Sequence, residues 1–209
     1  MYSHMISTYR DMFAACVIAL LCLASMIHSA PQDCQDVIQP LDQLDPDHLE
    51  GRWPLVAGSL SDPAHLEFFR NRNSSSITFS NASATSNIVY TPSVSAGGKC
   101  FYKSYNVSLE GSTLTFDVRD QVNLTLTFLH TSCPDCLVMR FDNESKKVLR
   151  LWLFSRRREV KQREMEEFKA QVECLNMPPP VVLDPAKELC PEQSNRNSAA
   201  AQTVEKQEG

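Results

Sequence analysis

Cys133 and Cys136 have the Cys-x-x-Cys spacing that supports two kinds of chemistry. Such a pair exchanges disulfides in thioredoxin-like proteins, or supplies two of the four ligands of a zinc ion. The redox motif needs a strand-helix-strand context, whereas this pair lies between two predicted strands. A zinc site needs a second cysteine pair or a histidine pair. We therefore expect a structural turn at Pro134-Asp135, without a metal or a cofactor.

Nucleophilic catalysis has little support in this chain. Beyond residue 30 the histidines are His48, His65 and His130, and none stands beside a serine or cysteine nucleophile in a recognisable motif. A serine or cysteine nucleophile depends on an adjacent base for its activation. The sequence therefore predicts a binding protein and not an enzyme.

Two cations, Lys103 and Arg150, stand in predicted strands whose other inward residues are mainly apolar. An unpaired charge in an apolar interior is costly, so each of them requires an anion. A ligand with a phosphate or carboxylate headgroup meets this requirement. A guanidinium toxin would be repelled unless acids such as Glu110 or Asp117 turned inward.

The N-terminal residues have the order of a secretory signal peptide. Arg10 precedes an uncharged run from Met12 to Ile27, and the small residues Ser29 and Ala30 follow it. The run is short for a membrane span, which needs about 20 residues. We expect a signal peptide at residues 1–30, cleaved after Ser29 or Ala30, and a retained anchor is the alternative.

The cysteines and asparagines beyond residue 30 fit export. Six cysteines remain there, and an even number behind a signal peptide indicates up to three disulfides in an oxidising compartment. Five Asn-x-Ser/Thr triplets are candidate glycan sites. They stand at Asn73, Asn81, Asn106, Asn123 and Asn143. The sequence predicts a secreted, glycosylated protein of blood plasma or mucus.

Length and charge exclude other classes. The 209 residues, 43% of them hydrophobic, suffice for one domain of ordinary size. The formal net charge of −5 gives no basic excess for binding nucleic acid. We expect one domain at residues 31–192, acting as a monomer, and a disordered polar tail at residues 193–209.

Short β-branched and aromatic runs separated by turn residues predict an all-β fold between Leu49 and Phe154. Eight strands are expected, near residues 52–59, 76–80, 85–91, 99–107, 113–118, 122–129, 136–142 and 147–154. A helix is expected from Arg158 to Leu175, because Met165, Phe168 and Val172 form one apolar stripe with Leu175. Eight strands with one helix packed outside, against Leu149, Leu151 and Leu153, indicate an antiparallel up-and-down barrel that holds one small ligand.

Side-chain alternation indicates which residues face the barrel interior. A glycan on Asn123 must point to solvent, which places Leu124, Leu126 and Phe128 inward. The same reasoning from Asn106 places Phe101, Lys103 and Tyr105 inward. The predicted ligand-binding wall is Phe101, Lys103, Tyr105, Phe116, Phe128, Met139, Arg150, Trp152 and Phe154. A barrel that these side chains fill completely is the alternative.

Gly51-Arg52-Trp53, preceded by a helical segment from Leu41 to Leu49, resembles the opening motif of the lipocalin family. In that family the tryptophan crosses the closed end of the barrel, and an arginine after the last strand stacks on it. Arg156 matches this position. The C-terminal part, including Leu189-Cys190-Pro191, resembles the branch of alpha-1-acid glycoprotein (orosomucoid) and apolipoprotein M. That branch includes fish proteins that bind tributyltin and pufferfish proteins that bind saxitoxin and tetrodotoxin.

This resemblance implies the disulfides Cys34–Cys174 and Cys100–Cys190. The helix position that bonds to the Cys133 position in apolipoprotein M is Glu164 here, which leaves Cys133 and Cys136 as each other's partners. With all six cysteines paired, the free barrel cysteine of prostaglandin D synthase-type lipocalins is not expected. The apolipoprotein M resemblance also places a headgroup-binding arginine at Arg150.

The sequence thus predicts a secreted lipocalin that transports or sequesters a small hydrophobic or amphipathic ligand, such as tributyltin, saxitoxin or tetrodotoxin. Two alternatives stay open: an apolipoprotein M-like carrier of an anionic lipid, and a surface-interaction glycoprotein with a filled barrel. The basic run Arg156–Arg158, with Lys161 and Arg163, is expected to be a solvated face apart from Arg156. Attraction to anionic membranes or glycosaminoglycans, and so to a lipoprotein or cell surface, is its alternative role.

Overall fold

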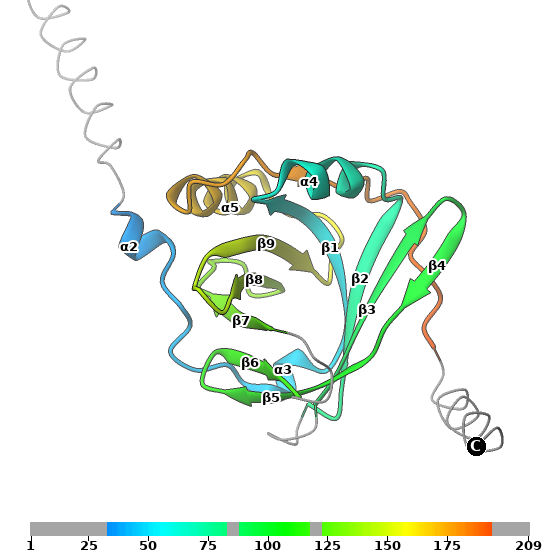
Figure 1. The fold of residues 1–209 in the computed structure, drawn as a ribbon, viewed down its shortest axis with the longest axis horizontal. Coiled ribbons are helices and arrows are strands. Elements are labelled where there is room, and N and C mark those ends of the chain that lie inside the picture. Colours follow the sequence, from blue (N-terminus) through cyan, green and yellow to red (C-terminus); the bar gives the residue numbers. More distant parts are fainter. Residues whose placement is uncertain (1–32, 83–87, 118–122, 194–209) are drawn as a thin grey trace, which may run out of the picture. The chain divides into compact units, whose positions relative to one another are not determined.

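A computed structural model of the chain describes residues 33–82, 88–117 and 123–193 (Figure 1). The predicted signal peptide and, apart from Gln193, the predicted tail lie outside the described residues. The chain divides into two units, residues 1–36 and 37–209. In the first unit residues 33–36 are described, and the short helix α2 (Cys34–Val37) begins there. All other described elements belong to the second unit.

The described strands of the second unit form a closed antiparallel barrel (Figure 1). They are β1 (Gly51–Leu60), β2 (Ser74–Ser80), β3 (Ile88–Ala96), β4 (Lys99–Tyr102), β5 (Tyr105–Glu110), β6 (Thr113–Phe116), β7 (Leu124–Leu129), β8 (Cys136–Asn143), β9 (Val148–Ser155) and β10 (Val181–Val182). Neighbouring strands pair in the order β1-β2-β3-β5-β6-β7-β8-β9, and β1 also pairs with β9, which closes the ring. β4 and β5 both pair with β3 in one continuous register and count as one barrel strand, while β10 is added to the edge of β1. The predicted eight-stranded all-β barrel is confirmed.

The barrel strands separate two apolar clusters by alternation. Along β7, Leu126 and Phe128 are buried inside the barrel while Thr125 is exposed, as the alternation from Asn123 predicts. The second cluster lies outside the barrel, where Leu151 and Leu153 of β9 pack with residues of helix α5 (Gln162–Cys174). The outside helix is therefore confirmed.

The helices differ from the sequence prediction in their bounds. α5 begins at Gln162 and not at Arg158, because Arg158 has a left-handed φ of 64° that a helix cannot include. The helical segment before β1 is limited to α3 (Pro46–Leu49). A further helix, α4 (Pro63–Arg70), was not predicted, although Asp62 caps it by accepting a hydrogen bond from the Ala64 N–H at 2.9 Å.

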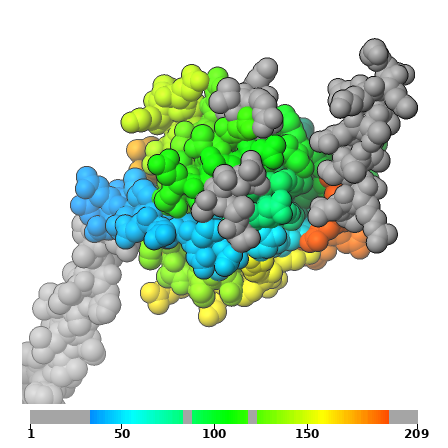
Figure 2. All heavy atoms as spheres, turned by 90° about the horizontal axis from the view of Figure 1, so that it is seen from below, coloured from blue at the N-terminus to red at the C-terminus, as the bar shows by residue number. Residues whose placement is uncertain are grey.

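One end of the barrel is closed by Trp53 and Arg156. Trp53 is fully buried and donates from Nε1 to the Leu49 carbonyl at 2.8 Å. The Arg156 guanidinium lies 3.9 Å from the Trp53 ring centroid and donates to the carbonyls of His48 (2.9 Å) and Glu50 (2.7 Å). Gly51, with φ +93°, leaves room here, since a Cβ would come within 3.3 Å of that guanidinium. The segment before β1, cyan in Figure 2, lies at the surface. It is attached to β7 by a hydrogen bond from the Leu41 N–H to the Phe128 carbonyl at 3.0 Å.

The predicted glycan sites lie at or near the surface. Asn73, Asn81, Asn106 and Asn123 are exposed, and Asn143 is half-buried with its Oδ1 accepting from the Lys147 N–H at 2.8 Å. Their glycosylation stays a prediction. Within the described ranges, no helix combines the length and the apolar composition that crossing a membrane requires.

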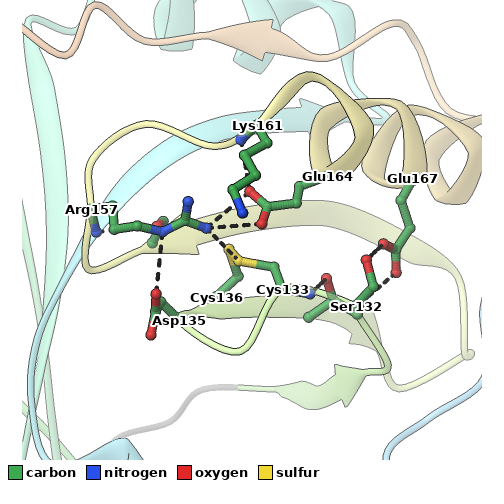
Figure 3. The surroundings of a disulfide bond; sticks show 10 residues. Ser132, Cys133, Asp135, Cys136, Arg157, Lys161, Glu164 and Glu167 are labelled. Atoms are coloured by element: carbon green, nitrogen blue, oxygen red, sulfur yellow. Dashed lines mark hydrogen bonds and ion pairs between the residues drawn. A yellow bond between two sulfur atoms is a disulfide. The ribbon is translucent and has the colours of Figure 1, made fainter.

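Arg157 joins α5 to the hairpin between β7 and β8 (Figure 3). Its Nη2 donates to both carboxylate oxygens of Glu164, at 3.0 and 2.9 Å, and to Cys133 Sγ at 3.0 Å. Its Nε lies 3.3 Å from the Asp135 carboxylate. Glu164 also accepts the Lys161 N–H at 2.7 Å, which completes a capping box at the start of the helix. One carboxylate thus fixes both the helix start and the arginine.

Glu164→Gln is expected to lower the free energy of unfolding by about 1–2 kcal/mol near neutral pH, through the loss of charge-assisted hydrogen bonds. Burial raises the pKa of Glu164, but the hydrogen bonds from Lys161 and Arg157 and the Arg157 charge outweigh it and hold that pKa below the ordinary 4.5. A depressed folded-state pKa stabilises the fold above the unfolded value and loses its effect as the pH falls through the folded value. Urea unfolding should therefore show a difference from wild type at pH 7 that shrinks well below pH 4.5.

The matched control is Glu166→Gln, an exposed carboxylate on the same helix. It should change the unfolding free energy by less than about 0.5 kcal/mol. Equal losses in both variants, or a Glu164→Gln loss that persists at low pH, would contradict the role of the Glu164 charge.

Candidate functional site

A cavity of about 190 Å³ lies inside the barrel. Its wall is mainly apolar and comes from several strands, with Leu55 on β1, Ile77 on β2, Phe116 on β6 and Phe141 on β8. Aromatic rings extend this wall, since Tyr105 packs edge-on against Phe116 at a centroid distance of 5.4 Å. Such a wall removes apolar ligand surface from water.

The polar residues of the cavity lining are two arginines, two tyrosines and a serine, which are Arg72, Arg150, Tyr90, Tyr105 and Ser75. Arg72 lines it with its Nε buried and without a hydrogen-bond partner among the described residues. Burial, and next the positive charge of Arg150, lower the pKa of Arg72. Burial raises the pKa of the Tyr90 hydroxyl well above its ordinary value, against the opposing charge of Arg150. The charge of Arg150 therefore lowers the pKa of Arg72 and opposes the rise in the pKa of Tyr90.

No acidic side chain from the described ranges lines this cavity. Within the same ranges, the ion pairs involve neither Arg72 nor Arg150. Two guanidinium groups thus face a mainly apolar cavity without a protein carboxylate between them. Such an arrangement favours an anion supplied from outside the protein.

The strand register places these cations near the open end of the barrel. Arg150 lies opposite Leu60, the last residue of β1, and Arg72 stands in the connection between α4 and β2. The closed end, with Trp53, is at the opposite ends of β1 and β9. A bound headgroup would therefore lie near the mouth, with apolar wall below it.

Trp152 is held in the cavity wall by a glycine opposite to it. Gly58 pairs with Trp152 across β1 and β9, and a Cβ on Gly58 would lie 2.1 Å from the indole ring. Phe69 of α4 packs against Trp152 at a centroid distance of 4.9 Å, and the same Cβ would come within 3.1 Å of Phe69. The indole is therefore confined by the bare backbone of Gly58 and by the Phe69 ring.

Five of the predicted wall residues line the cavity and four do not. Those that line it are Tyr105, Phe116, Arg150, Trp152 and Phe154. Phe128 and Met139 are completely buried but belong to the packed interior away from the cavity lining. They face the interior as predicted but do not line this cavity, because alternation gives the face of a residue and not its depth along the barrel.

The prediction that Phe101 and Lys103 lie inside the barrel is wrong. Phe101 is 57% exposed, and Lys103 is exposed with Nζ 4.9 Å from the Tyr105 ring centroid. Phe101 pairs with Val94, which lines the cavity, so the two share the inner face. The hairpin of β3 and β4 projects past the ring of strands (Figure 1), so this face meets solvent there.

Sequence reasoning missed Arg72 and Tyr90. Arg72 stands in a connection, where no alternation assigns a direction, and its short distance from Phe68 and Phe69 in the sequence was the available signal. Tyr90 is in a predicted strand in which no glycan triplet or other marker fixed the faces. Only the three-dimensional structure shows that both residues line the cavity.

The structure contains the disulfides Cys100–Cys190 and Cys133–Cys136. Cys34 and Cys174 are each disulfide-bonded, and their mutual pairing stays a prediction. Sulfur atoms of Cys133 and Cys136 and a carboxylate oxygen of Glu164 lie within 4.8 Å of one another, close enough to hold a metal ion. Because the two sulfurs are bonded to each other, they offer no thiolate ligands in this state.

Comparison with known proteins gives one family and one fold. A family model described as "ApoM domain" matches residues 14–193. The siderocalin Ex-FABP has a similar structure, with a TM-score of 0.58 and 15% identity over 70% of this chain and 97% of that one. Lipocalin 12 from rat epididymis has a TM-score of 0.59 and 14% identity over 74% and 93% of the two chains. A search of curated proteins gave no match.

Gly58→Ala is expected to destabilise the protein by about 1–3 kcal/mol, because the added methyl group overlaps the indole of Trp152. The tryptophan emission should shift as the ring moves from its place against Phe69. Denaturant unfolding followed by fluorescence measures both effects. Gly97→Ala is the steric control, since a Cβ there meets nothing within 4 Å, although φ +57° adds some backbone strain. Unchanged emission in Gly58→Ala would contradict the confinement of Trp152.

Proposed function

The chain belongs to the ApoM domain family and has the lipocalin fold, and from this premise we propose that it binds an amphipathic small molecule with an anionic headgroup. Proteins with this fold are generally carriers of hydrophobic ligands and not enzymes. The barrel supplies a mainly apolar cavity for such a ligand. The headgroup would be a phosphate or a carboxylate.

The observation that carries this proposal is the pair of guanidinium groups at one cavity. Arg72 and Arg150 line it, and neither has an ion-pair partner among the described residues. A bound anion would relieve their mutual repulsion and would give the buried Arg72 Nε a hydrogen-bond acceptor. Guanidinium groups form paired hydrogen bonds with phosphate and carboxylate oxygens, which makes these headgroups the fitting class.

The cavity also limits the size of the ligand. A volume of about 190 Å³ is below the roughly 300–1,000 Å³ of sites for drug-sized ligands. Because the cations lie near the mouth, the apolar tail would extend toward Leu55 and Phe154. A short tail fits this space directly, and a longer tail requires the interior side chains to rearrange.

The same charges weigh against the cationic toxins. Saxitoxin and tetrodotoxin carry guanidinium groups, and within the described residues no cavity carboxylate opposes the repulsion from Arg72 and Arg150. A completely filled barrel is disfavoured by the cavity itself. We therefore place the anionic amphiphile above the toxins and above a purely surface-acting glycoprotein.

We further infer that the protein is secreted and glycosylated. The signal-peptide pattern at residues 1–30, the disulfides and the four exposed asparagines of the glycan triplets support this inference. A lipocalin in extracellular fluid would carry its ligand between cells.

Octyl phosphate, octanol and octylamine test the headgroup, because they share one tail and differ in charge. We expect octyl phosphate to bind most tightly and octylamine least, measured by calorimetry with the purified protein. Arg72→Gln and Arg150→Gln should each weaken octyl phosphate binding by about 10–100-fold, through the loss of a charge-assisted hydrogen bond. Octanol binding should change little.

Arg163→Gln is the matched control, since Arg163 is exposed on α5 and does not line the cavity. It should bind all three compounds like wild type. Equal affinity for the phosphate and the amine would refute the proposal, as would arginine variants that bind octyl phosphate normally.

Arg72→Met is expected to stabilise the ligand-free protein while weakening octyl phosphate binding. Methionine keeps the packing on Phe69 and removes a charge that is desolvated and repelled by Arg150. We expect a gain of about 1 kcal/mol, or a rise of about 2–4 °C in Tm, by calorimetric unfolding without ligand. A lower Tm would show that Arg72 stabilises the empty fold and is not kept for a ligand.

A further inference from the structure

The open end of the barrel carries two exposed aromatic side chains, Phe68 and Phe101, with exposed fractions of 61% and 57%. Phe68 lies on α4, where the Arg72 guanidinium stands 5.6 Å from its ring centroid. Phe101 lies on β4, opposite Val94 of β3. Arg72 and Val94 both line the cavity. Each phenylalanine is therefore a direct neighbour of a residue that lines the cavity.

The hairpin of β3 and β4 presents a face of alternating cationic and aromatic side chains. Lys99, Phe101 and Lys103 point to one side of this hairpin, and Cys100 and Tyr102 point to the other. The second side is attached to the C-terminal segment by the Cys100–Cys190 disulfide and by a hydrogen bond from the Tyr102 hydroxyl to the Pro191 carbonyl at 2.8 Å. The hairpin is thus anchored from behind and leaves the Lys-Phe-Lys face open.

The charges around this face favour an anionic partner. The chain has a net charge of −5, yet no acidic residue occurs from Ile88 to Leu109, a segment that includes Lys99 and Lys103. On α4, Glu67 pairs with Arg70, and Asp62 at the N-cap lies 2.9 Å from His65 Nδ1. The open end therefore has accessible cations in a protein that is acidic as a whole.

We propose that this open end docks on an anionic lipid surface. Phe68 and Phe101 would lie at the level of the headgroups, and Lys99 would contact the lipid phosphates and carboxylates. Aromatic side chains flanked by basic residues are typical of protein segments that sit at a membrane interface. A stable protein interface has a contiguous apolar core, whereas these two rings stand apart and beside cations. The observations thus favour the lipid surface.

Docking in this orientation turns the cavity mouth toward the bilayer. An amphiphile could then pass between bilayer and barrel without full exposure to water. This consequence rests on the proposed function, whereas the docking itself depends only on the surface of the open end.

Vesicle binding tests the docking. The protein purified from the medium of expressing cells is mixed with vesicles of phosphatidylcholine alone, or with about one third phosphatidylserine, and separated by flotation. We expect binding to the phosphatidylserine vesicles that weakens with added salt, and little binding to phosphatidylcholine alone. Phe101→Ala and Phe68→Ala should each lower binding by about tenfold, and Lys99→Gln by about fivefold.

Two variants serve as matched controls away from the mouth. Val182→Ala removes another exposed large apolar side chain, on β10, and Lys169→Gln removes an exposed cation on α5. Both should bind vesicles like wild type. All variants share the same N-terminus, so any difference between them reports the altered side chain.

The docking proposal and the ligand-site proposal can be refuted independently. Phe101→Ala and Lys99→Gln, whose side chains do not line the cavity, should still bind octyl phosphate in solution like wild type. Vesicle binding that is absent, insensitive to salt, or equally reduced in the control variants would overturn the docking proposal, even if octyl phosphate binds. Loss of cell-surface binding in Phe101→Ala with unchanged vesicle binding would also overturn it, in favour of a protein partner.

Discussion

The pairing of β1 with β9 is the constraint on which the rest of the structure depends. This ladder closes the sheet into a barrel and so leaves no free edge between the first and last strands. It also fixes the depth of three cavity residues, since Phe154, Trp152 and Arg150 lie opposite Leu55, Gly58 and Leu60. At the closed end of the barrel the same two strands bring the Arg156 guanidinium over the Trp53 ring. Closure of the barrel and construction of the site are therefore one event.

The site is stabilised by its surroundings and destabilised by its own charges. Apolar packing inside the barrel and between β9 and α5 can tolerate a local unfavourable contribution to stability. Arg72 and Arg150 make such a contribution, because desolvation and mutual repulsion act on Arg72 without a protein carboxylate to offset them within the described residues. Retaining two such groups makes physical sense when a ligand completes the charge balance.

The sequence predicted the faces of the strands better than their positions along the barrel axis. The period of two along β7 and β9 correctly separated Phe128 and Trp152 from their outward neighbours. It could not distinguish Phe128, which fills the packed interior, from Trp152, which lines the cavity, or from Phe101, which lies beyond the rim. Depth depends on the stagger between strands, which arises from the ladder register of the whole barrel. The position of Arg72 in the cavity could not be predicted from alternation either, because Arg72 follows α4 and does not lie in a strand.

The arginines at the two ends of the barrel make different kinds of contact. The sequence predicts that Arg156 stacks on Trp53 and that Arg157 and Arg158 are solvated, yet the fold engages all three side chains. Arg156 stacks on Trp53, Arg157 bonds to Glu164, and Arg158 donates to the Lys187 carbonyl. These contacts hold the closed end, the helix and the C-terminal segment together. Of these three arginines, only Arg157 pairs with carboxylates among the described residues, whereas the partners of Arg156 and Arg158 are neutral carbonyl oxygens and a ring. The cations at the open end are arranged differently, since Arg72 and Arg150 face the cavity and Lys99 faces solvent. The proposed ligand site and the proposed docking surface thus share one mouth, on elements that the closed end holds in place.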